Sequence, residues 1–221
     1  MKIIIPARFG SKGFPLKNRE LFKWTADIIP KNRVEDVWVT TDDPVIKLTA
    51  GEYGFKVIDR PEDLAGDTAS TRDVMLHAVE EIGCSTYDII TMLYLTYPQR
   101  TWQNVIDAHR FFIKHLDMGV TKSLLCRKEI ETSPYLYLEE TGAKGIFGRQ
   151  LKKHDLYRRQ DYPKCFEISH FISIFTAGEL YNLNNNLYNR STIFYQIPNV
   201  VDVDYLSDLK KINGFHNKHI N

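Results

Sequence analysis

Short apolar runs alternate with longer amphipathic segments through most of the chain, and this alternation limits the possible folds more than any other feature. The apolar runs lie at 2–6, 34–41, 55–58, 88–95 and 119–126. Helical patterns lie at 19–30, 44–53, 70–82 and 101–115. Strands that alternate with helices form βαβ units, with helices on both faces of a sheet. The sequence therefore predicts a doubly wound α/β fold with a mostly parallel sheet.

The alternation breaks between residues 127 and 165, where tyrosine, glycine and charged residues are frequent. We expect this segment to leave the sheet as a hairpin-like excursion. The pattern then resumes with strands expected at 166–175 and 192–198, a short helix at 176–182, and a C-terminal helix after the sequence VVDVDY. Aromatic side chains are common in protein interfaces, and the excursion carries Tyr135, Tyr137, Tyr157 and Tyr162.

Composition excludes several classes of protein. The formal net charge of +1 argues against a dedicated nucleic-acid-binding protein, which would carry a strong basic excess. Three scattered cysteines without a CxxC pair favour reduced thiols over a disulfide framework. No apolar run approaches the roughly 18 residues that a membrane helix needs, and the apolar start is too short for a signal peptide. We therefore expect a cytoplasmic protein that binds neither nucleic acid nor membrane.

The loop after the first strand combines backbone freedom with positive charge. Gly10 and Gly13 allow backbone N–H groups to turn inward and form a concave anion site. Arg8, Lys12 and Lys17 add charged donors suited to phosphate. The glycine spacing matches neither a Walker A loop nor G-x-G-x-x-G. Since ligands bind beyond the carboxyl ends of strands in such sheets, the loop is a candidate phosphate site, with an ordinary solvated loop as the alternative.

Two carboxylates one residue apart, Asp202 and Asp204, form a candidate metal site. On an extended strand their side chains would point to one face. Mg²⁺ usually takes one or two carboxylates together with substrate oxygens. The alternative is a polar strand end that leads into a helix, and Asp208 itself is expected to stabilise a helix start.

The opening segment IPARFGSKGFPLKN resembles the signature of the N-acylneuraminate cytidylyltransferases, the CMP-sialic acid synthetases. Four further segments are similar to those of this family, in the same order: VWVTTDD (37–43), RPEDLAGDTASTRDVMLHAV (60–79), RRQDYPKCFE (158–167) and VDVDYLSDL (201–209). The resemblance covers nearly the whole chain.

The resemblance implies a reaction in which an acidic nine-carbon sugar, sialic acid or a legionaminic- or pseudaminic-type relative, attacks CTP through its anomeric hydroxyl. CMP-sugar and pyrophosphate are the products, and Mg²⁺ is the implied cofactor. It also implies one nucleotide-diphospho-sugar transferase-like domain over residues 1–221, with the excursion at 127–165 helping to form a homodimer.

The resemblance also implies roles for individual residues. The catalytic group would be Arg8, Lys17 and Asp204. Nucleotide would be bound by Ala7, Arg8, Ser11, Lys12, Lys17, Asn18, Arg60 and Thr71. The acceptor sugar would be bound by Tyr94, Thr96, Arg159, Gln160 and His170, and the metal by Asp202 and Asp204.

Three departures from the family pattern concern mainly the acceptor side. Tyr94 stands where the family has glutamine on the sugar side of the cleft. The segment Ser169-His170-Phe171 replaces Asn-Gly-Ala, so bulkier side chains are expected to reshape the acceptor pocket, with a packed strand histidine as the alternative for His170. The chain is also several residues shorter after Asn18. These differences leave two other functions open: a same-fold nucleotidyltransferase with another nucleotide or sugar, and a nucleotide-binding member without turnover.

Overall fold

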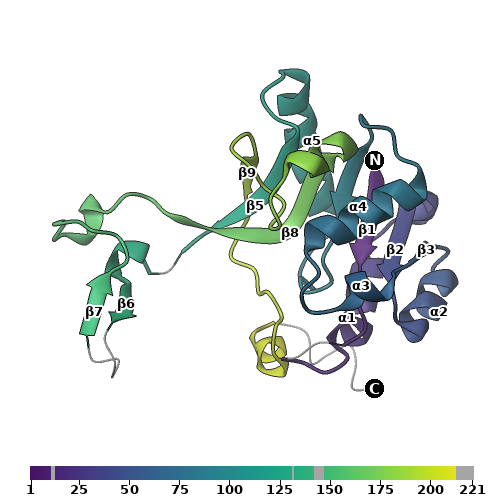
Figure 1. Ribbon diagram of the computed structural model, residues 1–221, viewed down its shortest axis with the longest axis horizontal. Helices are drawn as coiled ribbons and strands as arrows, with labels where there is room; N and C mark the ends of the chain where they lie inside the picture. The colour runs from purple at the N-terminus through teal and green to yellow at the C-terminus, as the bar shows by residue number, and fades with distance from the viewer. Residues whose placement is uncertain (11–12, 131, 142–146, 213–221) are drawn as a thin grey trace.

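The computed structural model describes residues 1–10, 13–130, 132–141 and 147–212 (Figure 1). Its centre is a seven-stranded sheet with the strand order β3-β2-β1-β4-β8-β5-β9. Neighbouring strands are parallel except β8, which runs antiparallel to both β4 and β5. The predicted doubly wound, mostly parallel α/β fold is confirmed.

The strands of the sheet are β1 (Lys2–Pro6), β2 (Val37–Thr41), β3 (Lys56–Asp59), β4 (Ile89–Met92), β5 (Ser123–Glu129), β8 (Phe166–Thr176) and β9 (Ile193–Gln196). The α-helices are α1 (Lys17–Ala26), α2 (Pro44–Glu52), α3 (Glu62–Ala65), α4 (Thr71–Ile82) and α5 (Trp102–Asp117). Short 3₁₀ helices are η1 (Lys31–Asp36), η2 (Pro134–Leu136), η3 (Arg159–Asp161), η4 (Ala177–Asn182) and η5 (Leu206–Lys211). Among the described residues, no helix combines the length and apolar character that a membrane crossing requires.

Two hydrophobic clusters cover the two faces of the sheet. Because side chains alternate along a strand, Ile3 and Ile5 of β1 join the cluster with α1, α2 and α5, whereas Ile4 joins the cluster with α4 and η4. All three isoleucines are fully buried. A central strand buried on both faces explains the continuous apolar run near the N-terminus.

Helix starts follow the local sequence. The side chains of Asp43, Ser70 and Thr101 each accept a hydrogen bond from a backbone N–H in the first turn of α2, α4 and α5. These caps satisfy donors that have no partner within the helix. The expected starts of the helices at 70 and 101 are confirmed.

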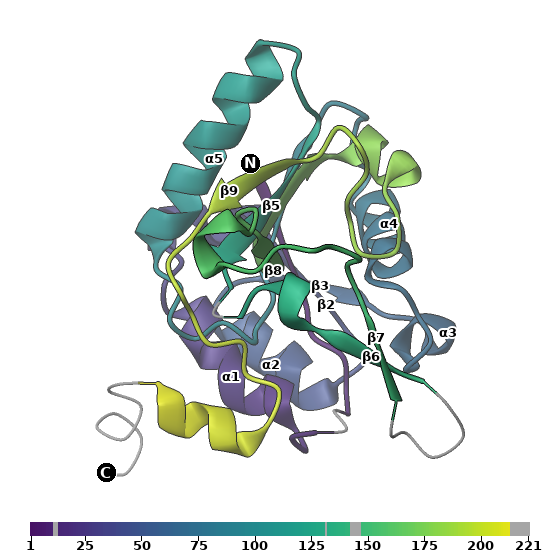
Figure 2. The same ribbon diagram turned by 90° about the vertical axis from the view of Figure 1, so that its left-hand side faces the viewer.

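Several expected boundaries were wrong. The helix expected at 19–30 begins earlier, at Lys17, and ends at Ala26. The segment 201–204 forms no strand, and the C-terminal helix is the short 3₁₀ helix η5. Its position depends on tertiary contacts, because Leu209 and Ile212 are buried in the cluster that contains α1. Figures 1 and 2 both show η5 beside α1.

The excursion between β5 and β8 forms an arm that projects from the body (Figure 1). It carries an antiparallel hairpin of β6 (Leu138–Thr141) and β7 (Phe147–Gln150), as the hairpin-like expectation proposed. Within the arm the rings of Tyr135 and Tyr162 stack, with their centroids 5.9 Å apart. The arm also exposes Tyr137 and Tyr157. Dimerisation through this arm stays a prediction.

A partly buried ion pair links α1 to the start of α2. Arg19 donates two hydrogen bonds to the carboxylate of Asp43, at 2.8 and 3.0 Å, and Asp43 also accepts from the N–H of Val45. Burial alone would oppose ionisation of Asp43, but the hydrogen bonds from Arg19 and Val45 outweigh it, so the pKa of Asp43 is lowered. We expect ionised Asp43 to stabilise the fold.

We predict that Asp43→Asn lowers the free energy of unfolding at pH 7 by about 1.5 kcal/mol, because asparagine keeps the cap but loses the charge-assisted pair. Since the folded-state pKa lies below the unfolded value of roughly 3.9, the difference from wild type should disappear as the pH falls through the folded-state pKa. Urea denaturation at several pH values measures this. The control is Asp59→Asn, whose carboxylate is 82% exposed and should matter little. Equal effects of both variants would contradict the prediction.

Candidate functional site

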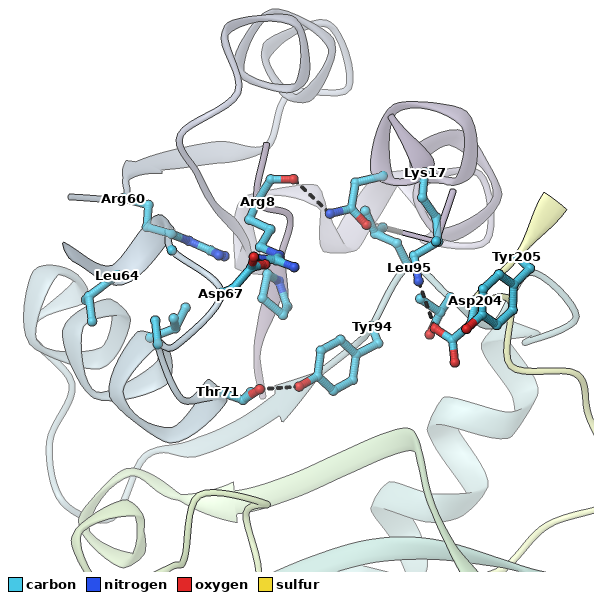
Figure 3. A pocket seen from close by; sticks show the side chains of 17 residues that line it. Arg8, Lys17, Arg60, Leu64, Asp67, Thr71, Tyr94, Leu95, Asp204 and Tyr205 are labelled. Atoms are coloured by element: carbon cyan, nitrogen blue, oxygen red, sulfur yellow. Dashed lines mark hydrogen bonds and ion pairs between the residues drawn. The ribbon is translucent and has the colours of Figure 1, made fainter. Parts of the chain in front are cut away.

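A cavity of about 470 Å³ opens at the carboxyl ends of β1 and β4 (Figure 3). Four parts of the chain form it: the loop after β1, the segment from Arg60 to α4, the segment after β4, and the segment before η5. The residues that line it are Pro6, Arg8, Gly13, Lys17, Asn18, Arg60, Leu64, Gly66, Asp67, Ala69, Thr71, Val74, Tyr94, Leu95, Thr96, Asp204 and Tyr205. The structure therefore brings together residues that are nearly 200 positions apart.

Each of two predicted phosphate-binding cations is paired with a carboxylate inside this cavity. Lys17 Nζ lies 2.9 Å from Asp204 Oδ1, and Arg8 lies 2.6 Å from Asp67 Oδ1. The Lys17 side chain is 14% exposed, whereas that of Asp204 is 64% exposed. Both carboxylates are accessible, and both cations line the same cavity. An anionic ligand can therefore replace the carboxylates as the partner of Arg8 and Lys17, and Asp204 can then bind a metal ion.

The loop that carries these cations is held from several sides. The side-chain amide of Asn18 donates to the carbonyl of Arg8 at 2.9 Å, and the N–H of Phe9 donates to Asp42 at 2.7 Å. Thr41 donates through its hydroxyl to the carbonyl of Ala7. Ala7 is fully buried and does not line the cavity, so any nucleotide contact it made would be through its backbone.

At Gly13 the loop packs tightly against the C-terminal segment. A Cβ atom at Gly13 would lie 2.8 Å from the carbonyl oxygen of Asp204 and 3.0 Å from Cε1 of Tyr205. Such distances are too short for any side chain. The packing of the loop against Asp204 and Tyr205 therefore requires glycine at position 13.

We predict that Gly13→Ala lowers kcat/KM for the nucleotide that the family resemblance implies by roughly tenfold or more, because a misplacement of about 1 Å in a reacting group is costly. Gly66→Ala is the matched control, since Gly66 also lines the cavity but its added Cβ would meet nothing within 4 Å. Steady-state kinetics of both variants, with circular dichroism to verify folding, make the comparison. A Gly13→Ala enzyme with normal kinetics would refute this account of the glycine.

Arg60, Thr71 and Tyr94 form the opposite wall. Arg60 is buried and donates to the carbonyl of Thr40 at 2.8 Å, while its Nε has no hydrogen-bond partner. Burial lowers the pKa of Arg60 to about 10, so it stays charged at neutral pH. The hydroxyls of Thr71 and Tyr94 are hydrogen-bonded to each other, and burial raises the pKa of Tyr94. This wall offers a buried cation and oriented hydroxyl groups to a polar planar ligand.

Asp202 and Asp204 point to different partners. Asp202 accepts a hydrogen bond from Tyr97 Oη at 2.8 Å, and it is not among the residues that line the cavity. The chain here is anchored by the Val203 N–H, which donates to the carbonyl of Thr96 at 2.9 Å. Within the described ranges no three His, Cys, Asp or Glu side chains form a metal cluster. A cation would therefore depend on substrate oxygens in addition to Asp204, as Mg²⁺ commonly does.

Two further predicted acceptor residues, Gln160 and His170, do not line the cavity. His170 packs edge-on behind Tyr94, with ring centroids 5.5 Å apart, and burial lowers the pKa of His170. Phe171, expected to fill acceptor space, is instead buried in the core. Gln160 is on η3 in the arm, as is the backbone of Arg159, whose side chain is outside the described part of the structure. Ser11 and Lys12 also lie outside the described residues.

Sequence reasoning assigned no role to Asp67 or Tyr205, both of which line the cavity. Asp67 belongs to the segment RPEDLAGDTAS, so the motif match was a signal for it. Tyr205 follows the second aspartate of VDVD, but a single aromatic residue after a polar motif gives no signal by itself. Asp208 fixes the backbone at Asp204 and Tyr205, because its carboxylate accepts hydrogen bonds from both of their N–H groups.

In the comparisons with known proteins, this chain is similar to cytidylyltransferases. A family model described as Cytidylyltransferase matches residues 2–98. An N-acylneuraminate cytidylyltransferase of Escherichia coli is 34% identical over 116 residues, 49% of this chain and 27% of that protein. A pseudaminic acid cytidylyltransferase of Campylobacter jejuni is 27% identical over 220 residues, 94% of this chain and 92% of that protein.

The fold has counterparts among solved structures. A CMP:2-keto-3-deoxy-manno-octonic acid synthetase complexed with CTP superposes with a TM-score of 0.64 and 16% identity over 95% of both chains. At this identity the likeness concerns the fold alone. The chain spans about half or less of the length of the N-acylneuraminate cytidylyltransferases from Escherichia coli and Streptococcus agalactiae that it matches.

Proposed function

We propose that the chain transfers CMP from CTP to the anomeric hydroxyl of an acidic sugar and releases pyrophosphate, because a cytidylyltransferase family model matches residues 2–98 and a pseudaminic acid cytidylyltransferase is similar over 94% of the chain. One observation carries the proposal. Arg8 and Lys17 converge with Asp204 on a single cavity at the carboxyl end of the sheet. A triphosphate needs such cations, and the transfer of its α-phosphoryl group needs mainly positioning and neutralisation of charge.

Each wall of the cavity would then have a task. The cytidine would lie against Arg60 and Thr71, where a buried guanidinium and a hydroxyl can hydrogen-bond to the base or ribose. The triphosphate would lie along the loop after β1, where it replaces Asp67 and Asp204 as the partner of Arg8 and Lys17. Charged donors held in place before reaction stabilise the charge that develops on the phosphoryl oxygens and the leaving pyrophosphate.

Mg²⁺ is the proposed cofactor. Asp204 would hold it from the cavity, with Asp202 nearby once its hydrogen bond with Tyr97 opens. Bound there, the ion would withdraw charge from the phosphates and favour ionisation of the attacking hydroxyl. Lys17 would pass from the carboxylate to the phosphate at the same time, so that neither group is left without a partner.

The acceptor is proposed to be a sugar acid of the kinds named in the relatives: an N-acylneuraminate, pseudaminic acid or 3-deoxy-manno-octulosonate. We further propose a homodimer formed through the arm, whose exposed side chains include Tyr157. A cytoplasmic location is part of the proposal too, and it is supported by three free thiols, at Cys84, Cys126 and Cys165.

The experiment is an assay for pyrophosphate release with CTP, Mg²⁺ and each of the sugar acids above, repeated with ATP, GTP and UTP. Release that requires CTP and one of these sugars is the expected result. Release with another nucleotide only would favour a nucleotidyltransferase of different specificity. Binding of CTP by calorimetry without release under any condition would favour a non-catalytic member.

We predict that Asp204→Ala lowers turnover at least tenfold even at saturating Mg²⁺. Asp204 is the proposed ligand of the ion, and a higher Mg²⁺ concentration does not replace a missing ligand. Asp67→Ala is the comparison, since Asp67 pairs with the other cation. Its turnover should depend on Mg²⁺ as in wild type. If Asp204→Ala keeps most of its turnover, the metal role of Asp204 is wrong.

A further inference from the structure

Tyr205 stands at one end of the cavity, and the proposed reaction as set out above gives it no task. It lines the cavity and is 61% exposed. Figure 3 places its ring next to Asp204, at the end opposite Arg60 and Leu64. Tyr205 is therefore an accessible aromatic side chain at the end away from the wall proposed for cytidine.

The position of Tyr205 is well supported. Its N–H donates to Asp208 Oδ2 at 2.9 Å, and Asp208 is itself buried and paired with Lys211 at 2.8 Å. On the other side the ring lies against Gly13, where an added Cβ would come within 3.0 Å of Cε1. A side chain with so few free torsions, held at its backbone and along one edge, can contact a ligand with little loss of entropy.

The other aromatic residue that lines the described part of the cavity, Tyr94, already has partners for its hydroxyl and its ring. Tyr94 is hydrogen-bonded through its hydroxyl to Thr71, on the wall proposed for cytidine, and its ring packs against His170. Tyr205 thus supplies the aromatic surface at the opposite end. Its neighbour Asp204 is where the metal and the reacting phosphate are proposed to lie, so a sugar that attacks this phosphate must pass close to the ring.

We infer that Tyr205 is a specificity-determining residue for the acceptor, packing its ring against the C–H face of the sugar acid. A sugar ring has polar hydroxyl groups around its edge and apolar C–H groups on its faces. Removing those C–H groups from water against an aromatic ring stabilises the complex. This inference rests on the proposed cytidylyl transfer, because it takes the second ligand to be a sugar.

The kinetic test compares Tyr205→Ala with Leu206→Ala. Leu206 is the next residue and is also 61% exposed, but it does not line the cavity. Tyr205→Ala should raise the KM of the acceptor by about tenfold, with the KM of CTP almost unchanged, and Tyr205→Phe should behave as wild type. Leu206→Ala should leave both constants unchanged. An equal rise in both KM values would assign the ring to supporting the loop at Gly13 and would overturn the inference.

A second measurement separates this inference from the proposed function. Saturation-transfer NMR can detect binding of each sugar acid to the protein loaded with a non-hydrolysable CTP analogue, whether or not the enzyme turns over. Saturation of the sugar protons should occur in wild type and Leu206→Ala and be lost in Tyr205→Ala. Equal saturation in all three proteins, or none in wild type, would overturn the role of Tyr205. Sugar binding without pyrophosphate release would instead count against the proposed reaction.

Discussion

Replacing Lys17 with methionine is expected to lower kcat/KM for CTP by roughly 10²–10³, the loss seen when one preorganised donor to a developing charge is removed. Lys17 begins α1 beside the cavity, and its Nζ lies 2.9 Å from Asp204 with the side chain only 14% exposed. Methionine has a similar length and flexibility but no charge. The triphosphate would then face Arg8 with one cation fewer, and both binding and transfer should suffer.

The fold should tolerate this change. Because the carboxylate of Asp204 is 64% exposed, the Lys17–Asp204 pair contributes little to stability, so the melting temperature should stay close to that of wild type. Lys23→Met is the control, since Lys23 is exposed in the last turn of the same helix. Steady-state pyrophosphate release and thermal melting of wild type, Lys17→Met and Lys23→Met test this prediction. A Lys17→Met enzyme as active as Lys23→Met would remove Lys17 from the proposed triphosphate site.

The largest effect on stability is expected from Phe171→Ala, which should lower the free energy of unfolding by about 3–5 kcal/mol. Phe171 is 1% exposed. Its ring packs edge-on against Tyr97 at 5.6 Å, and the guanidinium of Arg100 lies 5.8 Å from its centre. Alanine would leave a cavity in the hydrophobic core.

Urea denaturation at pH 7 provides the measurement. Tyr87→Ala is a suitable control, because this aromatic side chain is 88% exposed and its loss should change stability by less than about 0.5 kcal/mol. Should Phe171→Ala unfold at the same urea concentration as wild type, the ring would not be part of the packed core. The alternative expectation, that its bulk shapes the acceptor pocket, would then regain support.

Local patterns identified most elements of the fold. The continuous apolar run of β1 and the caps at Asp43, Ser70 and Thr101 depend on neighbours in the sequence, so they could be identified from it. Boundaries were less accurate, because the end of a helix depends on what it packs against. The antiparallel direction of β8 and the 3₁₀ helix η5 arise from contacts with distant strands and with α1.

The candidate site divides in the same way. Arg8, Lys17 and Asn18 lie within one short motif, so the motif alone could indicate them as a group. Gln160 lies in a segment similar to the family's, and His170 lies where the chain departs from the family pattern, yet neither residue lines the cavity. Sequence order carries no information about which segments meet in space. For the same reason the place of Tyr205 at the cavity could be recognised only from the structure.

By itself, the sequence determined that this chain forms a doubly wound α/β sheet with a cationic loop at the carboxyl end of its first strand. Spacing, charge and apolar periodicity are local properties, and they suffice for that conclusion. Only the tertiary structure decided that Asp204 faces Lys17, that Asp202 turns to Tyr97, and that Tyr205 borders the cavity. Those relations depend on how the C-terminal segment packs against Gly13, a contact between residues that are far apart in the chain.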